Sequence, residues 1–235
     1  MTQTAGLLDD IRGIATAVAV PHHEPPSTVL RRRIVVVVVL VIGGALLGYS
    51  LTRQPGDESF YWLTLALAAV WALGAFASGP LHLGCVRFRG RNQRPVITGT
   101  VAGLALGAAF LVGGLIAREI PGVREFVTRV LDFASQGPLV LVVFITVING
   151  VAEELYFRGA LYTALGKAYP AVVSTVIYVV TILATGNPML AFAGVIVGAV
   201  CAWERRATGG VLAPMLTHFF WGLVMVLALP PIFGV

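Results

Sequence analysis

Charged side chains are scarce in this chain: aspartate, glutamate, lysine and arginine make up 11% of it, whereas hydrophobic residues make up 57%. A soluble domain carries charge on about a quarter of its residues, so this composition excludes an ordinary soluble protein. The mean hydropathy of +0.89 points the same way. We therefore expect an integral membrane protein whose main partner is the lipid bilayer. The net charge of +5 then indicates orientation in the membrane, and no nucleic acid partner is expected.

Cysteine and histidine are also too few for the sites that they usually build. The two cysteines, Cys85 and Cys201, have neither the number nor the spacing of a disulfide framework or a metal site. His22 and His23 are adjacent and could bind a metal, but without further ligands such a pair is more typical of a solvated loop. A single histidine beside two glutamates, further along the chain, is a poor ligand set for zinc. We predict no metal and no cofactor.

Long apolar runs predict an all-α, polytopic membrane bundle with about seven transmembrane helices. The predicted spans are 34–51, 60–77, 96–117, 138–165, 170–185, 188–203 and 211–229. Residues 1–30 are polar and contain prolines, which indicates a cytoplasmic N-terminal tail with a short helix near 7–20 rather than a cleaved signal peptide. Residues 31–117 are expected to form three N-terminal transmembrane helices, and residues 138–235 a helical core.

The basic residues favour one orientation of this bundle. With the N-terminus in the cytoplasm, twelve of the sixteen lysines and arginines fall on the cytoplasmic side. They include the arginines of 31–33, those of 87–94 and those of 204–206. The last group, with Gly209 and Gly210, predicts a charged, flexible loop between the sixth and seventh spans. We expect a multi-pass protein of the plasma (inner) membrane with a cytoplasmic N-terminus and an external C-terminus.

Residues 118–137 differ from the rest because charged and apolar side chains interleave there. The spacing suits an amphipathic helix that lies at the membrane interface. A helix that docks onto a partner protein would have the same pattern, and the sequence does not separate the two.

Two adjacent acids, Glu153 and Glu154, interrupt the apolar run 138–165 and are followed by Arg158. Of the eleven acids in the chain, these two are the ones that lie inside long hydrophobic sequence. A charge at membrane depth costs about 2.5–3.5 kcal/mol on insertion scales, so such residues are usually paired and functional. On a helix Glu154 and Arg158 share a face and can pair, whereas Glu153 is rotated by about 100° and can point toward a cavity or a reagent. The alternative is a helix end at the cytoplasmic surface, with both acids in water and Arg158 as a topology charge.

Further polar residues recur in the later spans. Asn149 lies one turn before Glu153, and His218 lies in the seventh span. The fifth span carries a polar group made of Ser174, Thr175, Tyr178 and Thr181. A buried histidine near a glutamate is the minimum set for activating water at neutral pH, because the carboxylate takes the proton while the imidazole orients or donates. A purely structural, hydrogen-bonding role for His218 is the alternative.

The sequence Glu-Glu-Leu-Tyr-Phe-Arg-Gly at 153–159 resembles the Glu-Glu-x-x-x-Arg motif of the CAAX protease and bacteriocin-processing (Abi) family of intramembrane glutamate endopeptidases. The segment 208–218 is similar to that family's last motif block, and the resemblance covers roughly residues 138–229. In that family the first glutamate activates a water together with the histidine of a Phe-x-x-x-His motif. A second histidine and an asparagine, spaced His-x-x-x-Asn, stabilise the oxyanion. The resemblance implies that Glu153 is the base. It makes Glu154 and Arg158 a supporting pair, and His218 an oxyanion donor.

The chain departs from this pattern in the second and third motifs. The best alignment places Tyr178 at the phenylalanine and Ile182 at the histidine of the second motif. No histidine occurs between Glu154 and His218. Gly222 stands where the asparagine of the third motif would be. Both motifs are therefore degenerate. A missing general acid–base group costs about 10²–10⁴ in rate, and a missing oxyanion donor about 10²–10³, so an ordinary protease mechanism is poorly supported.

Two functional hypotheses follow. The first is a non-catalytic relative that keeps the scaffold and acts as a subunit or partner of a membrane assembly, with other membrane-protein subunits as partners. The second is an active intramembrane endopeptidase, in which Glu153 activates water to cleave a membrane-anchored peptide or a prenylated protein tail. The degenerate motifs favour the first hypothesis. A transporter is a distant third, because the sequence has one buried charged cluster and no inverted repeat.

Overall fold

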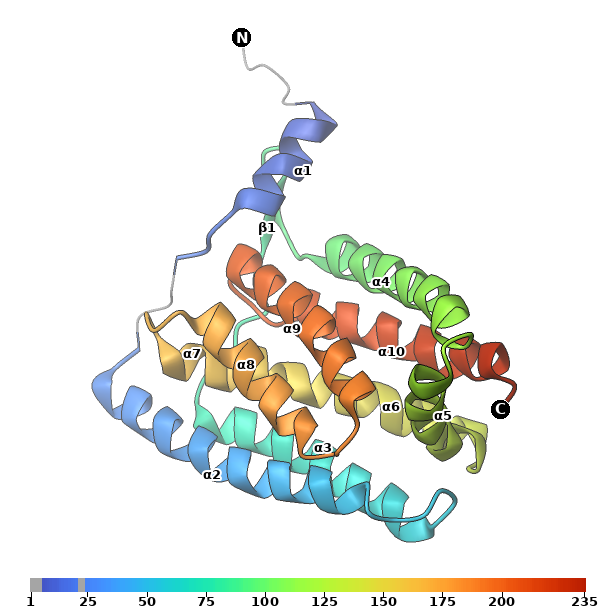
Figure 1. The fold of residues 1–235 in the computed structure, drawn as a ribbon. Helices are drawn as coiled ribbons and strands as arrows, with labels where there is room; N and C mark the ends of the chain where they lie inside the picture. Colours follow the sequence, from blue (N-terminus) through green and yellow to red (C-terminus); the bar gives the residue numbers. More distant parts are fainter. Residues whose placement is uncertain (1–5, 21–23) are drawn as a thin grey trace.

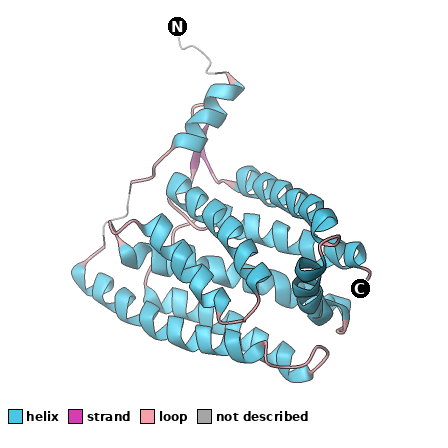
Figure 2. Cartoon of the chain, viewed as in Figure 1, coloured by secondary structure: helices cyan, strands magenta, loops and turns pink. Residues whose placement is uncertain are grey.

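The computed structural model describes residues 6–20 and 24–235, and most of this part of the chain is helical (Figure 2). The elements, in chain order, are α1 (Leu7–Thr16), α2 (Pro26–Ser50), α3 (Glu58–Ser78), β1 (Val86–Phe88), β2 (Arg91–Gln93), α4 (Val96–Ala117), α5 (Pro121–Ser135), α6 (Leu139–Glu154), the π-helix η1 (Leu155–Leu161), α7 (Tyr162–Leu165), α8 (Pro170–Leu183), α9 (Pro188–Thr208) and α10 (Leu212–Phe233). The histidine pair at 22 and 23 lies outside the described residues.

Within the described residues, six helices are long and apolar enough to cross a membrane. They are α2, α3, α4, the continuous stretch Leu139–Leu165, α9 and α10. The seventh predicted span, α8, is apolar but has 14 residues, which is about 21 Å at 1.5 Å per residue. That is shorter than the roughly 30 Å hydrocarbon core of a bilayer. The predicted polytopic helical bundle is confirmed, with α8 as a shortened seventh member.

The stretch formed by α6 and η1 lies in the middle of the bundle (Figure 1) and contacts α2, α3, α8, α9 and α10. Its aromatic side chains explain this position. Tyr156 and Phe157 are almost fully buried, and both pack on Trp71 of α3, with ring centroids 4.5 Å and 5.2 Å from that of the indole. Aromatic burial of this kind is a major source of core stability. The two glutamates that precede these residues are therefore held in the interior of the bundle.

Helices α4 and α10 are in direct backbone contact because α4 presents glycines to α10. A Cβ atom on Gly99 would lie 2.6 Å from the carbonyl oxygen of Ala213, and one on Gly103 would lie 2.6 Å from that of Thr217. Small residues allow such close approach in membrane helices. The contact brings the backbone of α4 next to the turn of α10 that carries Thr217.

Helix α2 begins at Pro26 rather than at the predicted Ile34, so the arginines of 31–33 lie within the helix. Arg32 is completely buried, although a residue flanking a span was expected in water. It forms an ion pair with Glu24, and it donates hydrogen bonds to Ser78 Oγ at 3.0 Å and to the carbonyl oxygen of Pro80 at 2.9 Å. These three groups around one guanidinium explain how the charge is tolerated inside the protein.

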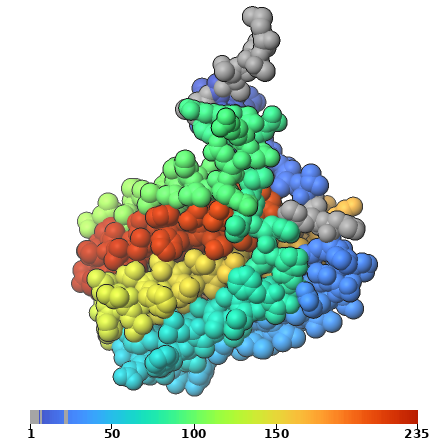
Figure 3. All heavy atoms as spheres, turned by 180° about the vertical axis from the view of Figure 1, so that it is seen from behind, coloured from blue at the N-terminus to red at the C-terminus, as the bar shows by residue number. Residues whose placement is uncertain are grey.

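Two further elements differ from the sequence prediction. Helix α9 continues to Thr208, so residues 204–206 are helical and not a flexible loop. Residues 86–93 form a short antiparallel hairpin, β1–β2, that the composition of this basic connection did not predict. The hairpin and α1 project together from one end of the bundle (Figures 1 and 3). The predicted amphipathic segment contains α5, which packs against α6, α9 and α10.

Candidate functional site

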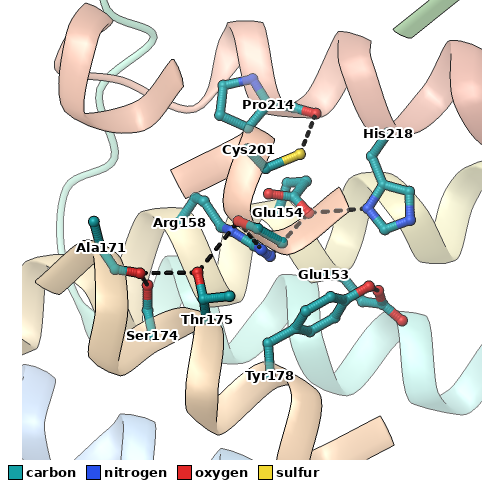
Figure 4. Close-up of polar contacts among 11 residues, drawn as sticks. Glu153, Glu154, Arg158, Ala171, Ser174, Thr175, Tyr178, Cys201, Pro214 and His218 are labelled. Atoms are coloured by element: carbon teal, nitrogen blue, oxygen red, sulfur yellow. Dashed lines mark hydrogen bonds and ion pairs between the residues drawn. The ribbon is translucent and has the colours of Figure 1, made fainter. Parts of the chain in front are cut away.

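Glu154, the last residue of α6, is the centre of a buried network. Arg158 Nη1 lies 3.0 Å from Glu154 Oε1, and His218 Nδ1 lies 2.9 Å from the same oxygen (Figure 4). Glu154 and Arg158 are fully buried, and His218 is 7% exposed. A single carboxylate oxygen thus joins the end of α6, η1 and α10. The alternative in which both acids lie in water at a helix end is wrong for Glu154.

Arg158 also ties this network to α8 and α9. Its Nη2 donates to the carbonyl oxygen of Gly198 at 3.0 Å, and its guanidinium stacks over the ring of Tyr178 at 4.7 Å. A Cβ atom on Gly198 would lie 3.1 Å from this Nη2, so the absence of a side chain lets α9 approach. Arg158 lies in the π-helical turn, whose wider geometry is often found at functional sites. The guanidinium therefore contacts three neighbouring elements at once.

Glu153 points in a different direction from Glu154, as the sequence predicted. Its Oε2 accepts a hydrogen bond of 2.9 Å from the hydroxyl of Tyr178 on α8 (Figure 4). The side chain is half-buried. The structure therefore gives the two adjacent acids separate partners, and the histidine contacts Glu154 rather than Glu153.

His218 reaches Glu154 because α6 carries glycine at position 150. A Cβ atom on Gly150 would lie 2.9 Å from Cδ2 of the imidazole, so any larger residue would move the ring. Trp221, one turn further along α10, packs its ring against the imidazole with centroids 5.5 Å apart. The histidine is consequently fixed on two sides and has the orientation of a hydrogen-bonded core residue.

The other polar residues singled out in the sequence lie near this network but make mostly local contacts. Asn149 Nδ2 donates to the carbonyl oxygens of Thr64 on α3, at 3.1 Å, and of Ile145, at 2.8 Å. Thr181 Oγ1 donates to the carbonyl oxygen of Ile177 in its own helix. Thr175 Oγ1 lies 3.2 Å from the carbonyl oxygen of Gly198 and so shares that acceptor with Arg158. These contacts connect helices and bring no further base to Glu153.

Glu204 is a second buried acid, and the sequence analysis missed it. It is 3% exposed, and its Oε1 lies 2.9 Å from Thr217 Oγ1. The prediction that Glu153 and Glu154 are the acids within apolar sequence was wrong in this respect. The spacing along α9 could have revealed Glu204, because it shares a face with Val197, Cys201 and Thr208, all of them buried.

A large groove lies away from this network. It has a volume of about 1330 Å³ and is lined by residues of α1, by residues within 81–94 and by Thr208 and Gly209. None of Glu153, Glu154, Arg158 and His218 lines it. Within residues 6–20 and 24–235, no cluster of three or more histidine, cysteine, aspartate or glutamate side chains is arranged to hold a metal ion.

Comparison with known proteins gives one match. Residues 135–224 match the family model described as type II CAAX prenyl endopeptidase Rce1-like. The matched region contains both glutamates, Arg158 and His218, and also the two positions that depart from the family motifs, Ile182 and Gly222. No curated protein and no solved structure matches the chain.

Proposed function

Because residues 135–224 match the Rce1-like family model of CAAX prenyl endopeptidases, we propose that this chain keeps the family scaffold without the protease activity. In this proposal it acts as a subunit or partner of another membrane assembly. Residues 138–235 supply the scaffold, and the three helices within 31–117 complete the bundle around it.

The observation that carries the proposal is the surrounding of Glu153, the residue that would activate water. Its hydrogen-bond partner is the hydroxyl of Tyr178, which is a poor base at neutral pH because a phenol ionises near pH 10. Ile182, at the position of the family's histidine, packs over α9 instead. A Cβ atom on Gly194 would lie 2.6 Å from its Cδ1. The imidazole that would share a water with Glu153 is replaced by an apolar contact.

The network around Glu154 supports the same proposal. His218 Nδ1 and Arg158 both engage Glu154 Oε1, so these groups satisfy a buried charge and link the end of α6 to α10. Polar contacts between helices stabilise membrane bundles independently of any chemistry. A non-catalytic scaffold needs this network as much as a protease does, which explains why it persists beside degenerate motifs.

The test is cleavage of a farnesylated peptide ending in a CAAX sequence, by the purified chain in proteoliposomes. We expect the wild type and Glu153→Gln to release product no faster than protein-free vesicles. Removing a working general base lowers a rate by about 10²–10⁴. Cleavage by the wild type that falls by such a factor in Glu153→Gln would establish the protease instead.

A restored variant provides the positive control for this assay. It combines Ile182→His with Gly222→Asn, which returns both missing motif residues. The Gly222 site has room for a first side-chain atom, because a Cβ there would meet Thr146 Cγ2 at an ordinary 3.6 Å. We expect cleavage by the restored variant and its loss when Glu153→Gln is added. If the restored variant is inactive as well, the two departures are not what removed the activity.

Subunit function is tested by purification from native membranes in mild detergent. We expect the wild type and Glu153→Gln to bring down the same membrane proteins, and Arg158→Met, which breaks the buried network, to lose them. Equal loss with Glu153→Gln would contradict a role that is independent of the base.

An active intramembrane endopeptidase remains the second candidate, and one observation favours it. Glu153 is half-buried and stands outside the Glu154–Arg158 ion pair, so its charge is not neutralised by the arginine directly. The substrate would be a membrane-anchored peptide or a prenylated tail.

We also propose that the chain resides in the plasma (inner) membrane with residues 1–30 in the cytoplasm and residues 118–137 at the opposite interface. Cys85 is exposed beside the hairpin, whereas Cys201 is buried, so each cysteine has a distinct expected reactivity. A membrane-impermeant maleimide should label Cys85 in inside-out vesicles and fail to do so in right-side-out vesicles. The reverse pattern would invert the topology, and Cys85→Ser gives the background from Cys201.

A further inference from the structure

Glu204 is a buried carboxyl group that forms no ion pair with any of the described residues. It lies on α9, is 3% exposed, and its hydrogen-bond partner within the described residues is Thr217 of α10. Its neighbour Arg205 points elsewhere: the guanidinium donates to the carbonyl oxygen of Arg158 at 2.7 Å and stacks over the ring of Tyr162. The next residue, Arg206, is exposed. The basic residues next to it in sequence therefore leave the carboxyl uncompensated.

The hydroxyl of Thr217 lies between two acceptors. Its Oγ1 is 2.9 Å from Glu204 Oε1 and 3.0 Å from the carbonyl oxygen of Gly99 on α4. A threonine hydroxyl has one proton to donate. The carbonyl oxygen can only accept, so when Thr217 donates to Gly99 the proton between Thr217 and Glu204 must come from Glu204. An ionised Glu204 would leave two acceptors competing for one hydrogen.

We infer that Glu204 is a proton-binding site, held as a neutral carboxylic acid at neutral pH, which donates to Thr217 while Thr217 donates to the backbone of α4. One proton then occupies each link of the chain from α9 through α10 to α4. A protonated carboxyl has one O–H donor, which fits the single contact of Glu204, to Thr217; its other oxygen, Oε2, is buried and has no hydrogen-bond partner within the described residues.

The charges that face Glu204 support the neutral form. On α6 and η1 these are Glu154 and Arg158, an ion pair whose two charges act on Glu204 in opposite directions. Cys201, on the same helix, is a buried thiol, and His218 on α10 is engaged with Glu154. The range Val96–Ala117 of α4 contains no titratable residue. A buried carboxylate without a paired cation is strongly disfavoured, and such groups take up a proton instead.

The proton has a structural consequence for the candidate site, because Thr217 directly precedes His218. The hydrogen-bonded chain fixes the turn of α10 that presents the imidazole to Glu154. Glu204 is thus a positioning residue: it acts on His218 through the backbone of α10 and makes the α9–α10–α4 contact dependent on a bound proton.

Infrared spectroscopy of the protein in lipid vesicles at pH 7 tests this, because exposed carboxyls, with pKa values near 4, are ionised there. We expect the wild-type spectrum minus that of Glu204→Gln to contain the C=O stretching band of a protonated carboxylic acid. Carboxylate bands in that difference spectrum would overturn the inference. Glu125→Gln, on the charged surface of α5, is the matched control and should remove carboxylate bands.

Thr217→Val keeps the size of the side chain and removes the hydroxyl. We expect the acid band of Glu204 to persist and to shift in frequency, since its hydrogen-bond acceptor is gone. An unshifted band would show that Glu204 does not donate to Thr217. We also expect Glu204→Gln to fold, because the amide has the shape of the neutral acid and, like it, a donor for Thr217. Failure of this variant to insert and fold would contradict a neutral Glu204. None of these outcomes depends on protease activity.

Discussion

Two buried glutamates lie against adjacent residues of α10 and differ in how their charge is handled. Glu154 contacts His218 and has the guanidinium of Arg158 at 3.0 Å, whereas Glu204 contacts Thr217 and forms no ion pair in the part of the chain that the structure describes. Their burial is almost the same, at 0% and 3% exposed. The difference shows that burial alone does not decide the state of an acid inside this bundle. The protonation state depends on whether the next turn of the same helix supplies a cation.

The spacing of basic residues explains the difference. Arg158 follows Glu154 by four positions, so both side chains lie on one face of the helix. Arg205 follows Glu204 directly, which rotates its side chain by about 100° and sends it to η1. Four positions after Glu204 stands Thr208, which has no charge to offer. We therefore expect neutral substitutions to lower the free energy of unfolding strongly at the Glu154–Arg158 pair and only weakly at Glu204.

The largest effect is expected for Arg158→Met, which leaves Glu154 buried with the imidazole as its remaining partner. Removing one member of a buried ion pair costs about 3–5 kcal/mol, so the free energy of unfolding in mixed detergent micelles should fall by that amount. Arg206→Met is the matched control, since Arg206 is exposed on α9, and it should change little. Equal effects of the two substitutions would mean that the Glu154–Arg158 pair is not a stabilising link.

Replacing each glutamate by glutamine tests the comparison itself. Glu154→Gln removes the anion and leaves Arg158 uncompensated, so we expect a loss of about 3 kcal/mol. Glu204→Gln replaces a neutral acid by a neutral amide and should cost less than about 1 kcal/mol, because the hydrogen bond to Thr217 is kept. The measurement is again the free energy of unfolding in mixed micelles. Similar losses at the two positions would remove the distinction between a charged and a neutral site.

The contacts of Glu153 and Glu154 also show which parts of the site could be predicted from the sequence. The Glu154–Arg158 pair and the separate direction of Glu153 followed from helical spacing alone, because they depend on one element. The contact of His218 with Glu154 depends on how α10 packs on α6, and the glycine that permits it, Gly150, carries no sequence signal of its own. The sequence therefore singled out Glu154, Arg158 and His218, which the structure brings together, but it did not predict that the imidazole contacts Glu154.

Glu204 and Arg32 were missed for a different reason. A cluster of charged residues was taken to mark the end of a span, whereas tertiary contacts extend α9 to Thr208 and α2 back to Pro26. Arg32 is neutralised by Glu24, across a segment of the N-terminal tail, and Glu204 by a proton. Neither compensation can be recognised from hydropathy, which scores each charge as if it were in water.

A smaller effect is expected from Gly150→Ala, which tests how closely His218 is held. The added Cβ would lie 2.9 Å from Cδ2 of the ring, and inserting a methyl group into a packed site typically costs about 1–3 kcal/mol. Gly222→Ala on α10 is the control, because its Cβ would meet Thr146 at 3.6 Å. We expect the nitrogen-15 chemical shifts of the His218 ring to change in Gly150→Ala and to stay in place in Gly222→Ala. Unchanged shifts in both variants would show that the ring has more freedom than the contact implies.

The smallest effect is expected from Thr217→Val, because hydrogen bonds between membrane helices contribute about 0.6 kcal/mol on average and at most about 1.7 kcal/mol. The free energy of unfolding should fall within that range, since Glu204 loses an acceptor and Gly99 loses a donor. Thr181→Val is the matched control: its hydroxyl bonds to Ile177 in its own helix, and it should be nearly neutral. If Glu204 were ionised, losing its one hydroxyl donor would leave a bare buried charge. The loss would then approach that of Arg158→Met, so the size of this small effect itself distinguishes the proton at Glu204 from a charge.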